Sequence, residues 1–137
     1  MSRPLVYIMG PYTNGDVAVN VALAMDMDHA LREVGLVPIC PHLSHFLHLK
    51  NPRPYQDWIE ADLEMLRVCD YAVRLPGKSS GADGEQAKAE QWGIELFHVG
   101  SPVGKPPTQE HMREAAQSVR AFYNRRLQKA RSDVRHD

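Results

Sequence analysis

Short apolar runs alternate with helical segments along this chain, and this alternation constrains its fold more than any other feature. Glycine or proline bounds most of the strand-like runs, which cover residues 5–9, 36–40, 70–75 and 94–99. Apolar residues recur at helical spacing over 17–34 and 55–68, a shorter helix is expected over 85–92, and 42–54 is expected to be a loop with one helical turn. Strands separated by helices predict a parallel sheet with helices on both faces and right-handed crossovers.

The C-terminal third of the chain is expected to differ from this α/β domain of residues 1–100. Residues 101–107 are predicted to be a linker, 108–131 a long helix, and 132–137 a frayed tail. The helix carries its apolar residues on one side, namely Met112, Ala115, Ala116, Val119, Phe122, Tyr123 and Leu127. Two interpretations stay open, packing on the chain's own sheet or contact within a homodimer. Its basic end could meet nucleic acid or a partner, although a solvated helix face is commoner.

Composition excludes several classes of function. The 137 residues fit one domain, and a formal net charge of -1 offers no general electrostatic attraction for nucleic acid. Cys40 and Cys69 lie among apolar residues without CxxC spacing, so we expect buried, reduced thiols. The N-terminal run resembles a strand more than a signal peptide, and no apolar run reaches membrane-spanning length. We therefore expect a cytoplasmic protein without a membrane partner.

Three segments follow strands, and ligands of an open parallel sheet bind beyond the carboxyl ends of its strands. These segments are 10–13, 41–42 and 76–84. The first is not a GxGxxG fingerprint, and the chain has no Walker loop, so dinucleotide binding and P-loop phosphoryl transfer lose their best support. The third combines glycines and serines with the start of a helix, whose free amides suit a phosphate or a sugar hydroxyl.

Two acidic residues are candidates for chemistry at these strand ends. Glu85 is expected in the first turn of the helix after 76–84, where an acid would also simply offset the helix dipole. Asp62 lies beside Leu63 and Leu66 on the helix before the third strand, and it is either a site residue or a solvated surface acid. Two carboxyl groups around one cleft are what glycosidic cleavage uses. Spacing alone leaves both interpretations open.

Three motifs together resemble a known family. They are, in order, Val6-Tyr7-Ile8-Met9-Gly10, then Ala61-Asp62-Leu63-Glu64-Met65-Leu66 with Asp70, then Ser79-Ser80-Gly81 with Glu85. Over roughly residues 5–100 the chain resembles the nucleoside 2-deoxyribosyltransferase family, which includes the 2'-deoxynucleoside 5'-phosphate N-hydrolases. The resemblance implies a flavodoxin-like α/β fold with a long C-terminal helix added, no cofactor, and a homodimer or larger homo-oligomer.

The resemblance also implies roles for individual residues. Glu85 matches the nucleophile that bonds to C1' of the sugar, Tyr7 the tyrosine that orients it, and Asp62 the aspartate beside the leaving base. Tyr7 could equally be a packed core tyrosine, and both can hold. Ser79 matches a serine that helps to bind the 5'-phosphate in the nucleotide hydrolases, whereas transferases acting on free nucleosides tend to carry an acid there.

The first loop departs from the family pattern. Pro11 and Thr13 stand where the nucleotide hydrolases have a serine and an arginine for the phosphate. Lys78, His42 and Arg74 are candidates to compensate.

The sequence therefore predicts an N-glycosidase that cleaves (deoxy)nucleoside 5'-monophosphates through a glycosyl-Glu85 intermediate. Release of the sugar to water makes a hydrolase and release to a second base makes a deoxyribosyltransferase. Beside the catalytic residues Glu85, Asp62 and Tyr7, the expected substrate-binding residues are Gly10, Pro11, Tyr12, His42, Ser79, Ser80 and Gly81.

Two further classes of function are alternatives to this prediction. His42, His45 and His48 lie three apart, which suggests a metal site, but only part of a helix face suits that spacing. We expect no metal, with His42 touching substrate and the other two solvated. A nucleotide-binding protein without catalysis remains the alternative, because fold does not determine function.

Overall fold

The computed structural model describes residues 3–136 and contains a four-stranded sheet with strand order β2-β1-β3-β4. The strands are β1 (Leu5–Met9), β2 (Val37–Ile39), β3 (Tyr71–Arg74) and β4 (Glu95–His98). All three pairings are parallel, with Tyr7 opposite Ile39 in β2 and opposite Ala72 in β3. The predicted parallel α/β fold is confirmed. Strand β2 lies on one side of β1, and β3 and β4 lie on the other, so the strand order changes direction at β1. Parallel sheets bind ligands at such a point.

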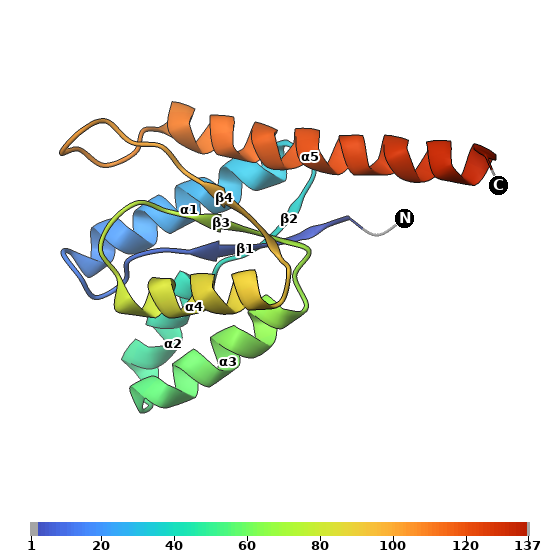
Figure 1. Cartoon of the computed structure of the whole chain (residues 1–137). Coiled ribbons are helices and arrows are strands. Elements are labelled where there is room, and N and C mark those ends of the chain that lie inside the picture. The colour runs from blue at the N-terminus through green and yellow to red at the C-terminus, as the bar shows by residue number, and fades with distance from the viewer. Residues whose placement is uncertain (1–2, 137) are drawn as a thin grey trace.

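Helices cover both faces of the sheet (Figure 1). On one side lie α1 (Val17–Glu33) and α5 (Gln109–His136), and on the other α3 (Tyr55–Arg67) and α4 (Ser80–Gln91). Because side chains alternate along a strand, Val6 and Ile8 of β1 pack with α1 and α5, whereas Tyr7 and Met9 pack with α3 and α4. Strand β1 is thus buried on both faces, which explains its uninterrupted apolar sequence.

The ends of helix α1 agree with the sequence signals. The Asp16 side chain accepts a hydrogen bond from the Val19 amide at 3.1 Å, which satisfies one of the free donors at the helix start. The helix ends at Glu33 with Val34 as its cap, just before Gly35. Buried Ala24, Met27 and Leu31 face the sheet from this helix.

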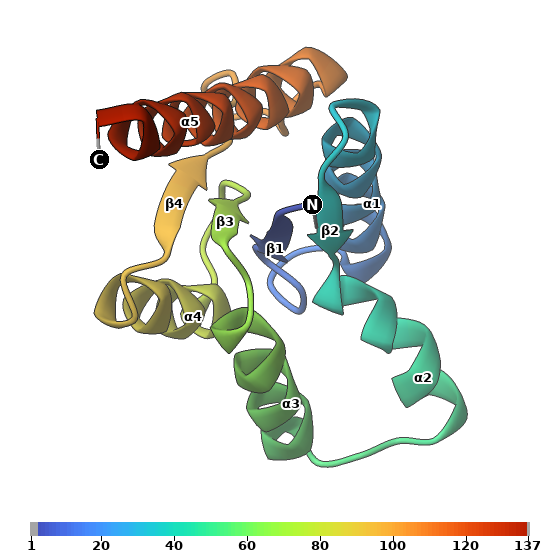
Figure 2. The same ribbon diagram turned by 90° about the vertical axis from the view of Figure 1, so that its right-hand side faces the viewer.

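The segment 41–50 is more helical than the sequence predicted. A 3-10 turn, Pro41–Leu43, leads directly into α2 (Ser44–Lys50). None of the residues of α2 is buried, and most of its apolar side chains remain exposed, so no buried apolar stripe marks it in the sequence. Figure 2 shows α2 and α3 extending away from the sheet, joined by the connection 51–54.

Helix α4 also begins earlier than expected, at Ser80 rather than Glu85. The Ser79 side chain accepts a hydrogen bond from the Ala82 amide at 3.1 Å and caps the helix. Glycines at positions 81 and 84 hid this start in the sequence, because glycine is a poor helix former. Glu85 therefore lies beyond the first turn, and the expected interaction with the helix dipole there does not apply.

Helix α5 packs on the chain's own sheet through its first half. Met112, Ala116 and Val119 are fully buried against β1, β3 and α1. The helix continues to His136, so residues 132–136 of the tail 132–137, which was expected to fray, are helical, and residue 137 lies outside the described residues. No glycine or proline interrupts residues 132–136. Its second half runs past the edge of the sheet (Figure 1). None of the helices within residues 3–136 is long and apolar enough to cross a membrane.

Candidate active site

A cavity of about 550 Å³ lies at the carboxyl ends of β1 and β3, between the α2–α3 pair and the start of α4. Eight residues predicted from the sequence line it, namely Gly10, Tyr12, His42, Asp62, Ser79, Ser80, Gly81 and Glu85. Tyr7 lies just behind the wall, in contact with Glu85. Pro11 is the exception, because it does not line the cavity. Its carbonyl instead accepts a hydrogen bond from Nε2 of His42 at 3.0 Å.

Tyr7 and Glu85 meet across the interface between β1 and α4. Tyr7 is fully buried, and its hydroxyl donates a hydrogen bond to Oε2 of Glu85. Burial and the neighbouring carboxylates raise the pKa of Tyr7 far above its usual range, so the hydroxyl keeps its proton and remains a donor. The tyrosine is therefore both a packed core residue and the partner of Glu85, as the sequence allowed.

The two carboxyl groups share the cavity but differ in their surroundings. Burial raises the pKa of Glu85 from 4.5 to about 7, although the bond from Tyr7 and the charge of Arg74 act in the opposite direction. Burial and the charge of Glu85 raise the pKa of Asp62 from 3.8 to about 7, with nothing to oppose them. The Tyr7 hydroxyl and the charge of Arg74 favour the anion at Glu85, and nothing comparable acts on Asp62. We therefore expect Glu85 to ionise before Asp62.

The start of α4 brings polar groups to the cavity. Ser79 Oγ is occupied as the helix cap, while its hydroxyl proton stays free to donate. A Cβ added to Gly81 would lie 3.0 Å from the hydroxyl of Tyr55, so the first turns of α3 and α4 approach each other closely here. Ser79, Ser80 and Gly81 all line the cavity at this end.

The side chains of His42, His45 and His48 form hydrogen bonds with different residues, and their spacing in the sequence does not predict these partners. His42 is 6% exposed, its Nε2 donates to Pro11, and its Nδ1 has no partner among the described residues. Burial lowers the pKa of His42, which leaves a neutral ring with a free lone pair on Nδ1. Nδ1 of His45 lies 2.6 Å from the hydroxyl of Tyr12, so His45 is bonded and half-buried rather than solvated.

His48 was also expected to be solvated, and it is instead part of the cavity wall. Its Nδ1 accepts from Nε1 of Trp58 at 2.9 Å and from the amide of Arg53 at 3.2 Å. These bonds join α2, the connection 51–54 and α3. Within residues 3–136, no three His, Cys, Asp or Glu side chains gather as they would around a metal ion.

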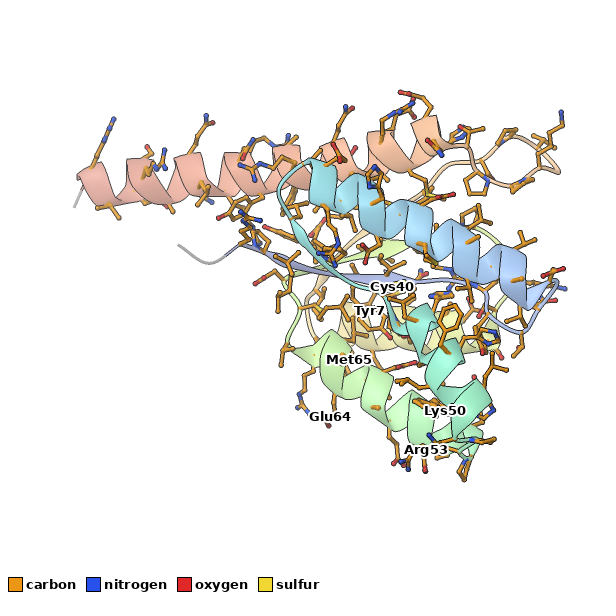
Figure 3. The ribbon with its side chains drawn as sticks, turned by 180° about the vertical axis from the view of Figure 1, so that it is seen from behind. Tyr7, Cys40, Lys50, Arg53, Glu64 and Met65 are labelled. Atoms are coloured by element: carbon orange, nitrogen blue, oxygen red, sulfur yellow. The ribbon has the colours of Figure 1, made fainter. Side chains whose placement is uncertain are left out.

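Sequence reasoning missed most of the α2–α3 wall. Tyr55, Trp58, Ile59 and Asp62 line the cavity from one face of α3 at helical spacing. This spacing would have found the aromatic residues once Asp62 was assigned to the site. Arg53 also lines the cavity, and of its described lining residues it alone is a lysine or arginine. It belongs to a connection without periodicity, at the outer end of the α2–α3 pair (Figure 3).

The candidates expected to replace the missing first-loop arginine do not all reach the cavity. Lys78 and Arg74 are absent from its lining, whereas His42 is present. The side chain of Arg74 turns to the backbone of the next loop, and Lys78 offers its carbonyl to the side chain of Asn14.

Comparisons with known proteins bear on the fold of this chain. The solved structure of a 2-deoxyribosyltransferase from the psychrotolerant bacterium Bacillus psychrosaccharolyticus is similar, with a TM-score of 0.51 at 16% sequence identity. The similarity covers 74% of this chain and 77% of that one, and at this identity it concerns the fold alone. A comparison with curated proteins finds no match. The family described as "Domain of unknown function (DUF7768)" matches residues 4–99, most of the chain, and the protein therefore belongs to that family.

Proposed function

We propose that this protein is an N-glycosidase that cleaves the base–sugar bond of (deoxy)nucleoside 5'-monophosphates. The observation that carries the proposal is the contact between the buried hydroxyl of Tyr7 and Glu85, in a cavity that also holds Asp62. Glu85 as the carboxylate and Asp62 as the carboxylic acid are the two groups that glycosidic cleavage requires. A protein that only binds nucleotides has no need of a half-buried carboxylate that a buried tyrosine orients.

The reaction follows from the protonation states of the pair. The Glu85 carboxylate attacks C1', the bond from C1' to the base breaks, and the proton of Asp62 moves to the departing nitrogen. Water then attacks C1' of the glycosyl ester, gives its proton to the Asp62 carboxylate and releases Glu85. The products are the free base and the sugar phosphate, and both carboxyl groups return to their starting states.

The cavity offers separate groups for the two ends of the substrate. The free amides at the start of α4, with the hydroxyls of Ser79 and Ser80, suit a phosphate. Arg53 supplies the cation that the first loop lacks. Aromatic rings from Tyr12 and Trp58 offer faces for a planar base.

Transfer of the sugar to a second base is the second candidate function. The solved structure with a similar fold is by name a 2-deoxyribosyltransferase, and a second base could take the place of water at the same glycosyl ester. The two functions share every step up to that intermediate.

The deciding experiment is a chromatographic product assay. The protein is incubated with nucleosides and 5'-monophosphates, ribo and deoxy, with and without a second free base. Free base released from monophosphates without an acceptor establishes the hydrolase, whereas a new nucleoside formed only with an acceptor establishes the transferase. If no substrate is cleaved, the enzyme proposal is wrong, and calorimetric binding of the same nucleotides then tests the non-catalytic alternative.

Three variants make the assay specific to the site. Glu85→Gln should lower turnover by about a thousandfold or more, because the nucleophile is lost. Glu90→Gln, an exposed acid on the same helix, should retain wild-type turnover. Arg53→Met should raise KM for monophosphates and leave nucleosides unaffected.

A further inference from the structure

Arg74 occupies an unusual place for a charged side chain. It is the last residue of β3, opposite Met9 of β1, and it is only 8% exposed. Because side chains alternate along a strand, Arg74 shares its face of the sheet with Ala72, whose partner in β1 is Tyr7. This is the face covered by α4, the helix that carries Glu85.

The guanidinium of Arg74 ties the loop after β3 to the start of α4. Nε donates to the carbonyl of Leu75 at 3.1 Å, and Nη2 donates to the carbonyl of Gly77 at 3.0 Å. Nη1 lies 3.1 Å from Oδ1 of Asp83, in an ion pair rather than an aligned hydrogen bond. One side chain thus holds both ends of the segment 75–83, which contains the cap of α4.

The clamped loop has little freedom to move elsewhere. A Cβ added to Gly10 would lie 2.7 Å from Cβ of Leu75, so the loop packs directly on the end of β1. Gly77 has a φ of 120°, and a Cβ there would lie 2.8 Å from the ring of Pro11. Any change in the loop would therefore be passed to Ser79 and to the helix that positions Glu85.

Arg74 also supplies a positive charge near Glu85, whose carboxyl group is partly shielded from water. Three ionisable groups interact with Glu85, namely Tyr7 from β1, Asp62 from α3 and Arg74 from β3. Arg74 is the cation among these three, while Arg53, His42 and His48 line the same cavity. Its charge lowers the pKa of Glu85, against the larger effect of burial. Asp83, with a side chain 73% exposed, offsets that charge only in part, because water screens exposed charges.

We propose that Arg74 is a positioning residue for Glu85, holding the start of α4 through the loop carbonyls and Asp83 and placing a positive charge on the face of the sheet that α4 covers. This proposal rests on the proposed role of Glu85. The two effects are separable, because a lysine keeps the charge but cannot match the planar fork that reaches both carbonyls and Asp83.

The test measures ionisation without any substrate. Carbon-13 NMR of labelled glutamate side chains, with the Glu85 signal assigned from Glu85→Gln, follows its titration in the wild type and three variants. In Arg74→Met, Glu85 should titrate about half a pH unit or more above wild type, because its cation is gone. In Arg74→Lys it should titrate near wild type. In Asp83→Asn it should shift to lower pH, because Arg74 is then less neutralised.

Kinetics on a cleaved substrate complete the test. The acidic limb of the kcat/KM profile should follow the same order, and Arg74→Lys should lower kcat about tenfold with little change in KM, because the carboxylate is ionised but misplaced. Unchanged titration in Arg74→Met, or wild-type kcat in Arg74→Lys, overturns the proposal. If Arg74→Met does not fold, an Asp83→Asn titration that is unchanged or raised overturns the charge effect. If the wild type cleaves no nucleoside or nucleotide, the proposed function fails, while the titrations still decide the role of Arg74.

Discussion

At the scale of single residues, burial and hydrogen bonding compete over the carboxyl groups of Glu85 and Asp62. Burial raises the pKa of both to about 7, above their ordinary values of 4.5 and 3.8. Between those values and 7 these two carboxyl groups bind more protons in the folded chain than in the unfolded chain. Their contribution to the free energy of unfolding therefore falls as pH rises through this window, and it levels off above it.

The Glu85→Gln variant should change this pH dependence. An amide needs no proton to be neutral, so the loss of stability between about pH 5 and 7 should become shallower, and stability at pH 7.5 should rise by about 1 kcal/mol or more. Urea unfolding at several pH values measures this, with Glu90→Gln as the control on an exposed acid of the same helix. A slope equal to that of the wild type would show that the pKa of Glu85 in the folded chain is close to its ordinary value.

Ser79 has one role that the structure shows and one that is proposed. Ser79→Ala should cost about 1 kcal/mol of stability, because the Ala82 amide loses its acceptor. Ser79→Asp should keep the cap, since aspartate also caps helices, but its charge should raise KM for a 5'-monophosphate about tenfold or more. Thermal unfolding and steady-state kinetics separate the two. Equal KM values in Ser79→Asp and wild type would show that the phosphate does not bind at this end of the cavity.

At the scale of elements, the loops at the strand ends are held by close backbone approach. Gly10→Ala should destabilise the chain by about 1–3 kcal/mol, because its Cβ would meet Leu75 at 2.7 Å in a packed interior. Gly84→Ala is the matched control, since no neighbouring atom lies within 4 Å of its Cβ and alanine favours the helix by about 1 kcal/mol. Denaturant unfolding should show a lower stability for Gly10→Ala and a higher stability for Gly84→Ala. Two changes of the same sign would contradict the close packing of β1 on the β3 loop.

The elements most visible in the sequence were those with a buried stripe. Strand β1 and helices α1 and α3 match their predicted ranges closely, because burial imposes the period of each element on its apolar residues. Helix α2 buries none of its residues, and α4 starts with glycines, so α2 was missed and α4 was placed too late. In both cases contacts that are distant in sequence stabilise a helix whose local signals are weak.

At the scale of the whole molecule, helix α5 is half core and half free surface. Met112→Ala should cost about 2–5 kcal/mol, because the side chain is fully buried against the sheet. Val134→Ala, on the same helix but 74% exposed, should change stability by no more than about 0.5 kcal/mol. A larger cost at Val134, measured by urea unfolding, would indicate that a second copy covers this end in solution. The predicted homo-oligomer stays a prediction.

The sequence by itself determined the parallel α/β fold, because the alternation of apolar periods can be buried in few other ways. It also identified the carboxyl ends of the strands and eight of the cavity-lining residues, through the topology of such sheets and a family resemblance. Tertiary structure alone decided the rest. The position of Arg53 and the contacts of Arg74 depend on side chains that meet across segments far apart in the chain. Local periodicity does not predict such contacts, because it indicates which face of an element is buried and not which residues pack against that face.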